Sequence, residues 1–203
     1  MSSIYHEGNR RLQDRFDTKR LADRLEAGAV KETISENDKA FIEARDMFFL
    51  STADEEGRPN CSYKGGDPGF VRVLDERTIA FPNYDGNGMY LSMGNVLKNP
   101  NVGMLFIDFE GQRRMRYNGI ASIDEQDPLM AEYPEAQFVV RVRAREVFPN
   151  CPRYIHQYRT VERSDSVPLA DCETPTADWK QGVASREPEL LPKSDRERLQ
   201  AQP

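Results

Sequence analysis

Residues 47–84 read MFFLSTADEEGRPNCSYKGGDPGFVRVLDERTIAFPNY, and this stretch decides the fold class. Its apolar runs, MFFLSTA at 47–53 and IAFPNY at 79–84, are typical of short strands. Clusters of turn-forming residues, such as DEEGRP at 54–59, bound these runs. Short strands joined by tight turns predict an antiparallel meander or Greek-key barrel, not a parallel sheet with crossover helices.

The downstream sequence adds one helix and more strands. GNGMYLSMGNVLKNP at 86–100 predicts a helix that begins near Gly88 or Met89 and ends at Asn99-Pro100. VGMLFIDF and RRMRYNGIASI are typical of two further strands. QFVVRVRAREVF alternates strictly, with Val140 and Val142 on one face and arginines on the other.

The sequence divides into three segments. Residues 1–46 read as helical, with Gly28 as a stop and Ser35 as the N-cap of a second helix, and we expect this layer to pack on the barrel. Residues 47–149 form the barrel core. Residues 150–203 form an extension rich in Pro, Asp, Glu and Ser, and its last part, 185–203, has the composition of a mobile tail.

Composition narrows the functional classes. The chain has 203 residues and a net charge of −6, with a pI near 5.1, which argues against general nucleic-acid binding. Its cysteines, Cys61, Cys151 and Cys172, form no CxxC pair, so neither a metal site nor a disulfide framework is indicated. The N-terminus lacks an apolar signal region and no apolar run could span a bilayer, so we expect a cytoplasmic protein.

Two loops are candidates for binding an anion. SYKGGDPG at 62–69 combines a hydroxyl, the charge of Lys64 and glycines that expose backbone amides. FPNYDGNG at 81–88 leads into the predicted helix, whose N-terminus would favour a phosphate. The alternatives are a plain turn with an exposed lysine in the first loop, and simple capping of the helix by Asn87 in the second.

Other constellations are weaker. In RRMR at 113–116, Arg114 and Arg116 share one face of a strand, which could meet a ligand, a partner subunit or only solvent. Cys151 and His156 could be a nucleophile and a base, but their spacing in a surface segment is equally a coincidence. The sequence holds no GxSxG and no HExxH motif.

The order of these parts resembles a known family. FFLSTADEEGRP, the GFVRVLDERTIAFPNY hairpin, the LKNPNVGMLF passage from helix to strand, and RRMRYNG are together similar to pyridoxamine 5′-phosphate oxidase and its relatives. The resemblance implies a mainly β fold with flanking helices, an antiparallel split β-barrel of the FMN-binding type. It also implies a homodimer with FMN at the subunit interface.

The resemblance implies a set of cofactor-binding residues. They are Ser62, Tyr63, Lys64, Gly65, Phe81, Pro82, Asn83, Asn87, Gly88, Met89 and Arg114. Phe81, Pro82 and Asn83 would offer backbone to the flavin ring, residues 87–89 would receive the phosphate, and Arg114 would lie near the ring.

This sequence departs from the family in two places. The oxidases place an Arg-Lys pair at the start of the helix, where this chain has Asn87-Gly88-Met89. Residues 150–203 also lack the Trp, Arg and His pattern that binds the vitamin substrate, so vitamin B6 oxidation is not implied. The expected function is an FMN-dependent oxidoreductase of a small molecule, with a flavin carrier or sensor as the alternative. F420 and haem, the latter with His156 as ligand, are further alternatives.

Overall fold

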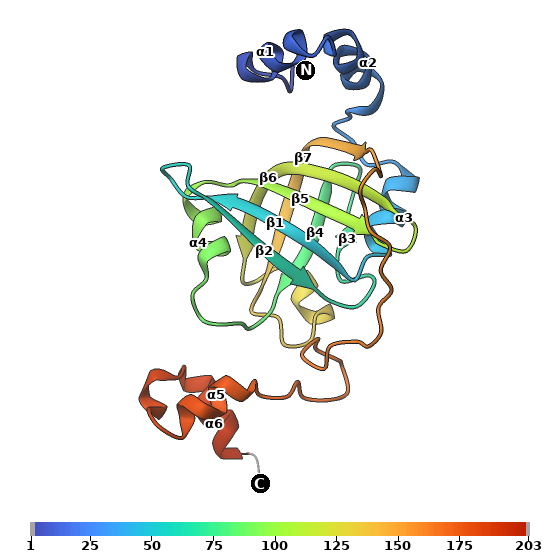
Figure 1. Ribbon diagram of the computed structural model, residues 1–203. Helices are drawn as coiled ribbons and strands as arrows, with labels where there is room; N and C mark the ends of the chain where they lie inside the picture. The colour runs from blue at the N-terminus through green and yellow to red at the C-terminus, as the bar shows by residue number, and fades with distance from the viewer. Residues whose placement is uncertain (1–2, 202–203) are drawn as a thin grey trace. The chain divides into compact units, whose positions relative to one another are not determined.

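The computed structural model describes residues 3–201, which fall into two compact units divided between Arg159 and Thr160. The first unit is built on one antiparallel sheet with the strand order β2-β1-β5-β6-β7-β4-β3 (Figure 1). The strands are β1 (Met47–Ala53), β2 (Pro59–Gly65), β3 (Arg72–Val73), β4 (Thr78–Asn83), β5 (Asn101–Asp108), β6 (Arg113–Asp124) and β7 (Phe138–Asn150).

The sheet curls into a barrel that is not closed. β4 pairs with β7 and not with its sequence neighbour β5, and β2 and β3 are the two edges of the sheet. The expected antiparallel split β-barrel is therefore confirmed. Because β3 pairs only with Ile79 and Ala80, the last part of β4, from Phe81 to Asn83, is also an edge among the described residues.

Alternation along the strands determines which side chains enter the barrel. In β5 the buried residues Val102, Met104 and Phe106 alternate with more exposed neighbours. Phe48 of β1 is fully buried, and its ring lies 5.0 Å from that of Phe81 and 5.2 Å from that of Phe106, measured between centroids. A strand period of two thus places one face of each strand in a shared aromatic core.

Gly119 marks a bulge in the longest pairing of the sheet. The register between β6 and β7 shifts at Asn118/Gly119. A Cβ atom at Gly119 would lie 2.3 Å from the backbone oxygen of Arg143. Only glycine allows the two backbones to approach so closely, and the bulge helps the sheet to bend.

Three helices precede the barrel: α1 (Glu7–Arg15), α2 (Lys19–Ala29) and α3 (Glu36–Glu43). Ser35 caps α3 as expected, in a capping box with Asp38, and Ile42 of α3 is fully buried in the barrel core. The expected stop at Gly28 was wrong by one residue, because α2 continues to Ala29.

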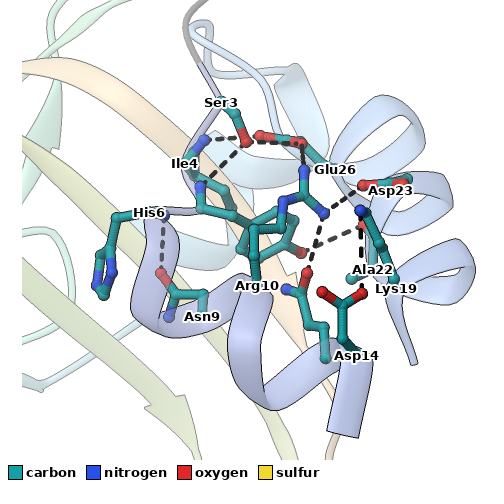
Figure 2. Close-up of polar contacts among 12 residues, drawn as sticks. Ser3, Ile4, His6, Asn9, Arg10, Asp14, Lys19, Ala22, Asp23 and Glu26 are labelled. Atoms are coloured by element: carbon teal, nitrogen blue, oxygen red, sulfur yellow. Dashed lines mark hydrogen bonds and ion pairs between the residues drawn. The ribbon is translucent and has the colours of Figure 1, made fainter. Parts of the chain in front are cut away.

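Polar contacts hold α1 and α2 together as a hairpin (Figure 2). Arg10 forms ion pairs with Asp23 and Glu26, and the hydroxyl of Tyr5 donates to the backbone oxygen of Ala22. The larger apolar side chains of this hairpin are exposed: Leu12, Phe16, Leu21 and Leu25. Packing of this hairpin on the barrel stays a prediction.

α4 (Leu91–Lys98) packs against β1 and β2 (Figure 1). Met93 and Val96 of α4 are buried, and the side-chain amide of Asn95 donates to the hydroxyl of Thr52 at 3.1 Å. The helix begins at Leu91, later than the expected Gly88 or Met89, because Tyr90 adopts left-handed backbone angles that a helix cannot contain.

One further short helix of the first unit, η1 (Pro128–Glu132), precedes β7. The second unit contains α5 (Asp178–Ala184), the short helix η2 (Pro188–Leu190) and α6 (Lys193–Ala201). The buried ammonium of Lys180 lies 2.8 Å from the carboxylate of Asp195 and joins α5 to α6. A regular helix therefore stands where the sequence suggested only a tail. Within residues 3–201 no helix has the length and apolar character needed to cross a bilayer.

Candidate functional site

A cavity of about 340 Å³ lies where the open barrel brings β2, the end of β4 and the start of α4 together. The edge strand β2 contributes to it, and so does Asn83 in the part of β4 that β3 does not cover. Its lining residues are Asn60, Ser62, Lys64, Asn83, Tyr84, Gly86, Asn87, Gly88, Met89, Tyr90, Leu91, Ser92 and Met93.

One wall of the cavity is the inward face of β2. Asn60, Ser62 and Lys64 alternate along the strand, and each is half-buried. Cys61 and Tyr63 point to the opposite face and are exposed. Since side chains two residues apart share a face of a strand, the amide, the hydroxyl and the ammonium form a polar row.

Lys64 supplies the positive charge of the lining. It forms no ion pair with a carboxylate among residues 3–201. Burial lowers the pKa of its ammonium below the ordinary lysine value, because a desolvated charge is unfavourable. A lysine that is held away from water and lacks a counterion is suited to bind an anionic group.

The opposite wall is the loop that enters α4. Gly88 has a φ of +74°, and the side-chain oxygen of Asn87 accepts a hydrogen bond from the backbone amide of Met89 at 3.0 Å. Tyr90 precedes the helix with a φ of +49°, and no side chain caps the first turn of α4. The first amides of the helix therefore lack a side-chain acceptor beside the cavity, which favours an anion there.

Ser92 joins the two walls. Its hydroxyl lies 3.0 Å from the side-chain nitrogen of Asn60 and 3.0 Å from the hydroxyl of Ser62. At the end of β4, the side chain of buried Asn83 donates to the side-chain oxygen of Gln137 at 3.0 Å. These contacts fix the polar groups of the cavity in place.

The structure brings about half of the predicted residues together. Ser62, Lys64, Asn83, Asn87, Gly88 and Met89 line the cavity. The remaining predicted residues lie outside its lining: Tyr63, Gly65, Phe81, Pro82 and Arg114. Asn60 and Ser92 were not predicted. Asn60 could have been predicted, because it shares the strand face of Ser62 and Lys64. Ser92 could not, because it reaches the cavity only when α4 packs on β2.

The predicted residues outside the lining have clear positions. The side chains of Phe81 and Pro82 are buried, and the Phe81 ring is part of the core. Tyr63 lies on the outer face of β2, where its ring packs at 6.3 Å from that of Phe49. Arg114 lies on the outer face of β6, opposite buried Met115, and its Nε donates to the backbone oxygen of Cys151 at 3.0 Å.

The groups that line this cavity are of the kinds that can bind an oxyanion. Its lining offers one ammonium, hydroxyls, amides and backbone N–H groups. It contains no Asp, Glu, His or Cys side chain. Nor do three or more such residues gather anywhere in the described part of the chain in a way that could hold a metal ion.

Comparison with known proteins identifies the family. The family model described as pyridoxamine 5′-phosphate oxidase matches residues 34–163. These residues include the whole barrel and the cavity. The chain therefore belongs to the pyridoxamine 5′-phosphate oxidase family. No protein with a curated description matches it.

The chain is also similar to solved structures, each at low sequence identity. HupZ of Group A Streptococcus is 18% identical, with 57% of this chain and 93% of that chain covered and a TM-score of 0.46. The heme storage protein HutZ of Vibrio cholerae is 20% identical, with coverages of 55% and 89% and a TM-score of 0.39. An FMN-binding protein of Syntrophomonas wolfei is 13% identical, with coverages of 70% and 97% and a TM-score of 0.43.

Proposed function

We propose that the chain binds FMN through the cavity between β2 and α4 and acts as an FMN-dependent oxidoreductase of a small molecule. The observation that carries this proposal is Lys64, a half-buried ammonium without a carboxylate partner among the described residues, in a cavity of about 340 Å³. Membership of a family that is named for the oxidation of a phosphate ester supports it.

The residues present fit the phosphate end of FMN. Lys64 provides charge, Ser62 provides a hydroxyl, and the uncapped first turn of α4 provides amides. These groups take the place of the Arg-Lys pair that this chain lacks. The cavity volume also lies in the range of about 300 to 1,000 Å³ that is common for cofactor sites.

FMN, when bound, supplies the redox chemistry, while the protein supplies binding, orientation and electrostatics. Lys64 and Ser62 hold the anionic end of the ligand. The exposed side chains of Met89 and Tyr90 line the cavity beside them and offer apolar surface to the rest of the ligand. The lining holds no carboxylate, imidazole or thiol side chain that could act as a general acid or base.

A homodimer is part of the same proposal. Tyr63, Phe49 and Leu105 are register neighbours on the outer face of β2, β1 and β5, and Tyr63 is 62% exposed. Phe49 and Leu105 are half-buried, and a partly exposed apolar row of this kind suits a subunit contact. Arg114 lies on the same outer face, paired with Ile107 of β5. In the dimer we propose, Arg114 reaches the flavin ring held by the second subunit.

The test is the purified protein itself. We expect a yellow protein that releases FMN on denaturation, identified by mass, and that scatters light as twice the chain mass of 23.3 kDa. A protein that is colourless and cannot be reconstituted with FMN contradicts the proposal. Release of F420 or haem would assign the cavity to that ligand instead.

The second candidate is a flavin carrier or sensor that does not turn over. It is favoured by one observation, the absence of any carboxylate, imidazole or thiol from the lining. Consumption of NADH or NADPH by the FMN-loaded protein separates the two functions. Sustained consumption supports the oxidoreductase, and tight binding without consumption supports the carrier.

A further inference from the structure

Three polar side chains form a continuous chain of hydrogen bonds along the cavity. The side-chain nitrogen of Asn60 lies 3.0 Å from the hydroxyl of Ser92. The same hydroxyl lies 3.0 Å from that of Ser62. Asn60 and Ser62 come from β2 and Ser92 from the first turn of α4, so the chain crosses from one wall to the other.

The donor and acceptor chemistry of these groups sets the direction of the hydrogen bonds, from Asn60 through Ser92 to Ser62. The Asn60 nitrogen can only donate, so the Ser92 oxygen accepts from it. Ser92 then has one hydrogen of its own, and the oxygen within reach is that of Ser62. Ser62 accepts this hydrogen, and its hydroxyl makes no further hydrogen bond among residues 3–201. The hydrogen of Ser62 is therefore available to the cavity.

We propose that Ser92 is a positioning residue that turns the Ser62 hydroxyl into a donor toward the oxyanion of the ligand. This inference rests on the proposed function, because it names how the same cavity selects a phosphate ester over its uncharged alcohol. Ser62 and Lys64 are two residues apart on one face of β2. In this proposal the hydroxyl of Ser62 and the ammonium of Lys64 bind different oxygens of one phosphate.

A purely structural role of Ser92 does not require this chain of hydrogen bonds. α4 is already held on the sheet by the buried side chains of Met93 and Val96 and by the hydrogen bond from Asn95 to Thr52. A buried hydroxyl is costly unless it is hydrogen-bonded, and Ser92 is 7% exposed. The role that we assign to Ser92 is to orient the hydroxyl hydrogen of Ser62 toward the cavity.

The test is a double-mutant cycle on the full chain with two probes, FMN and riboflavin. Their affinities are measured by fluorescence quenching for the wild type, Ser62→Ala, Ser92→Ala and the double variant. Ser92→Thr keeps the hydroxyl and is the rescue variant. Ser51→Ala, on the exposed outer face of β1, is the matched control.

We expect Ser62→Ala to weaken FMN binding by about tenfold or more, as for the loss of a hydrogen bond to a charged group. Ser92→Ala should weaken it by about fivefold, and the double variant should be no weaker than Ser62→Ala alone, because Ser92 acts through Ser62. Riboflavin affinity should stay unchanged in all variants, and Ser92→Thr should restore FMN binding.

Each other result overturns the inference. Additive losses would mean that Ser92 acts independently of Ser62, and equal losses for riboflavin would mean that the cavity has only been distorted. If the wild type binds no FMN, the proposed function fails separately. The same variants are then titrated with inorganic phosphate, and equal binding by all of them, or by none, refutes the role of Ser62.

Discussion

Replacement of Lys64 by methionine tests the charge on which the proposed function depends. Methionine keeps a long apolar side chain and removes the ammonium. Burial lowers the pKa of Lys64, which shows that the charged form is disfavoured in the free protein. We therefore expect Lys64→Met to leave the ligand-free protein at least as stable as the wild type.

The effect on FMN binding should be large. A hydrogen bond to a charged group contributes about 2 kcal/mol, which corresponds to about thirtyfold in affinity. FMN at about 100 times its Kd stabilises the wild type by about 2.7 kcal/mol. At the same concentration the variant keeps about 0.9 kcal/mol. For a chain of this size the difference is about 4 to 7 °C in Tm.

The assay is thermal unfolding of both proteins with and without FMN. Lys98→Met is the matched control, because Lys98 is an exposed lysine at the end of α4, paired with Glu55, and lies outside the cavity lining. Equal stabilisation of the wild type and Lys64→Met by FMN would refute the argument that Lys64 holds the phosphate.

Three further predictions concern the pH dependence of binding, the loop before α4, and the ion pair between Arg141 and the buried carboxylate of Asp127. FMN affinity should fall as the pH rises through the lowered pKa of Lys64, because only the ammonium form attracts phosphate. This fall should occur at a lower pH than for an exposed lysine. Titration calorimetry between about pH 7 and about pH 10 measures it, and an affinity that does not change with pH contradicts it. Gly88→Ala should cost about 1 kcal/mol in urea unfolding, because its φ is +74° and no atom crowds the new Cβ, whereas Gly86→Ala should cost less. Asp127→Asn should cost about 2 kcal/mol, because it loses the charge-assisted hydrogen bonds from Arg141. The Arg141 hydrogen bond holds the pKa of Asp127 below its ordinary value, so its stabilisation is present above about pH 4 and is lost as the pH falls through the folded pKa. Unfolding curves of wild type and variant should therefore converge in acid, and a constant difference would count against the assignment.

Local sequence predicted most of the elements because their signals are local. The alternation in β5 and β7 and the capping box at Ser35 depend on neighbouring residues. The start of α4 was predicted too early, since the left-handed backbone of Tyr90 is set by the loop that closes the cavity. α6 was not expected, because its support is the buried contact between Lys180 and Asp195 of the same unit.

Part of the cavity lining could also be indicated from the sequence, because its signals are local residue types. Ser62 and Lys64 were predicted from residue types that bind anions, and residues 87–89 from the helix N-terminus and the family resemblance. These residues line one cavity, and their role in binding a cofactor stays a prediction. Asn60 was missed although it shares the face of Lys64. Arg114 was assigned to the cofactor, but it lies on the outer face of the barrel, and only a second subunit would bring it near one.

The sequence by itself determined the alternation of core-facing residues along the strands and indicated Lys64 and Ser62 as the charge and one hydroxyl of the site. These properties follow from the strand period of two and from side-chain chemistry. Only the tertiary structure decided that β2 and the end of β4 remain edges, and that α4 docks on β1, β2 and β6. Ser62 and Ser92 are 30 residues apart, and their hydrogen bond depends on packing that no local pattern encodes.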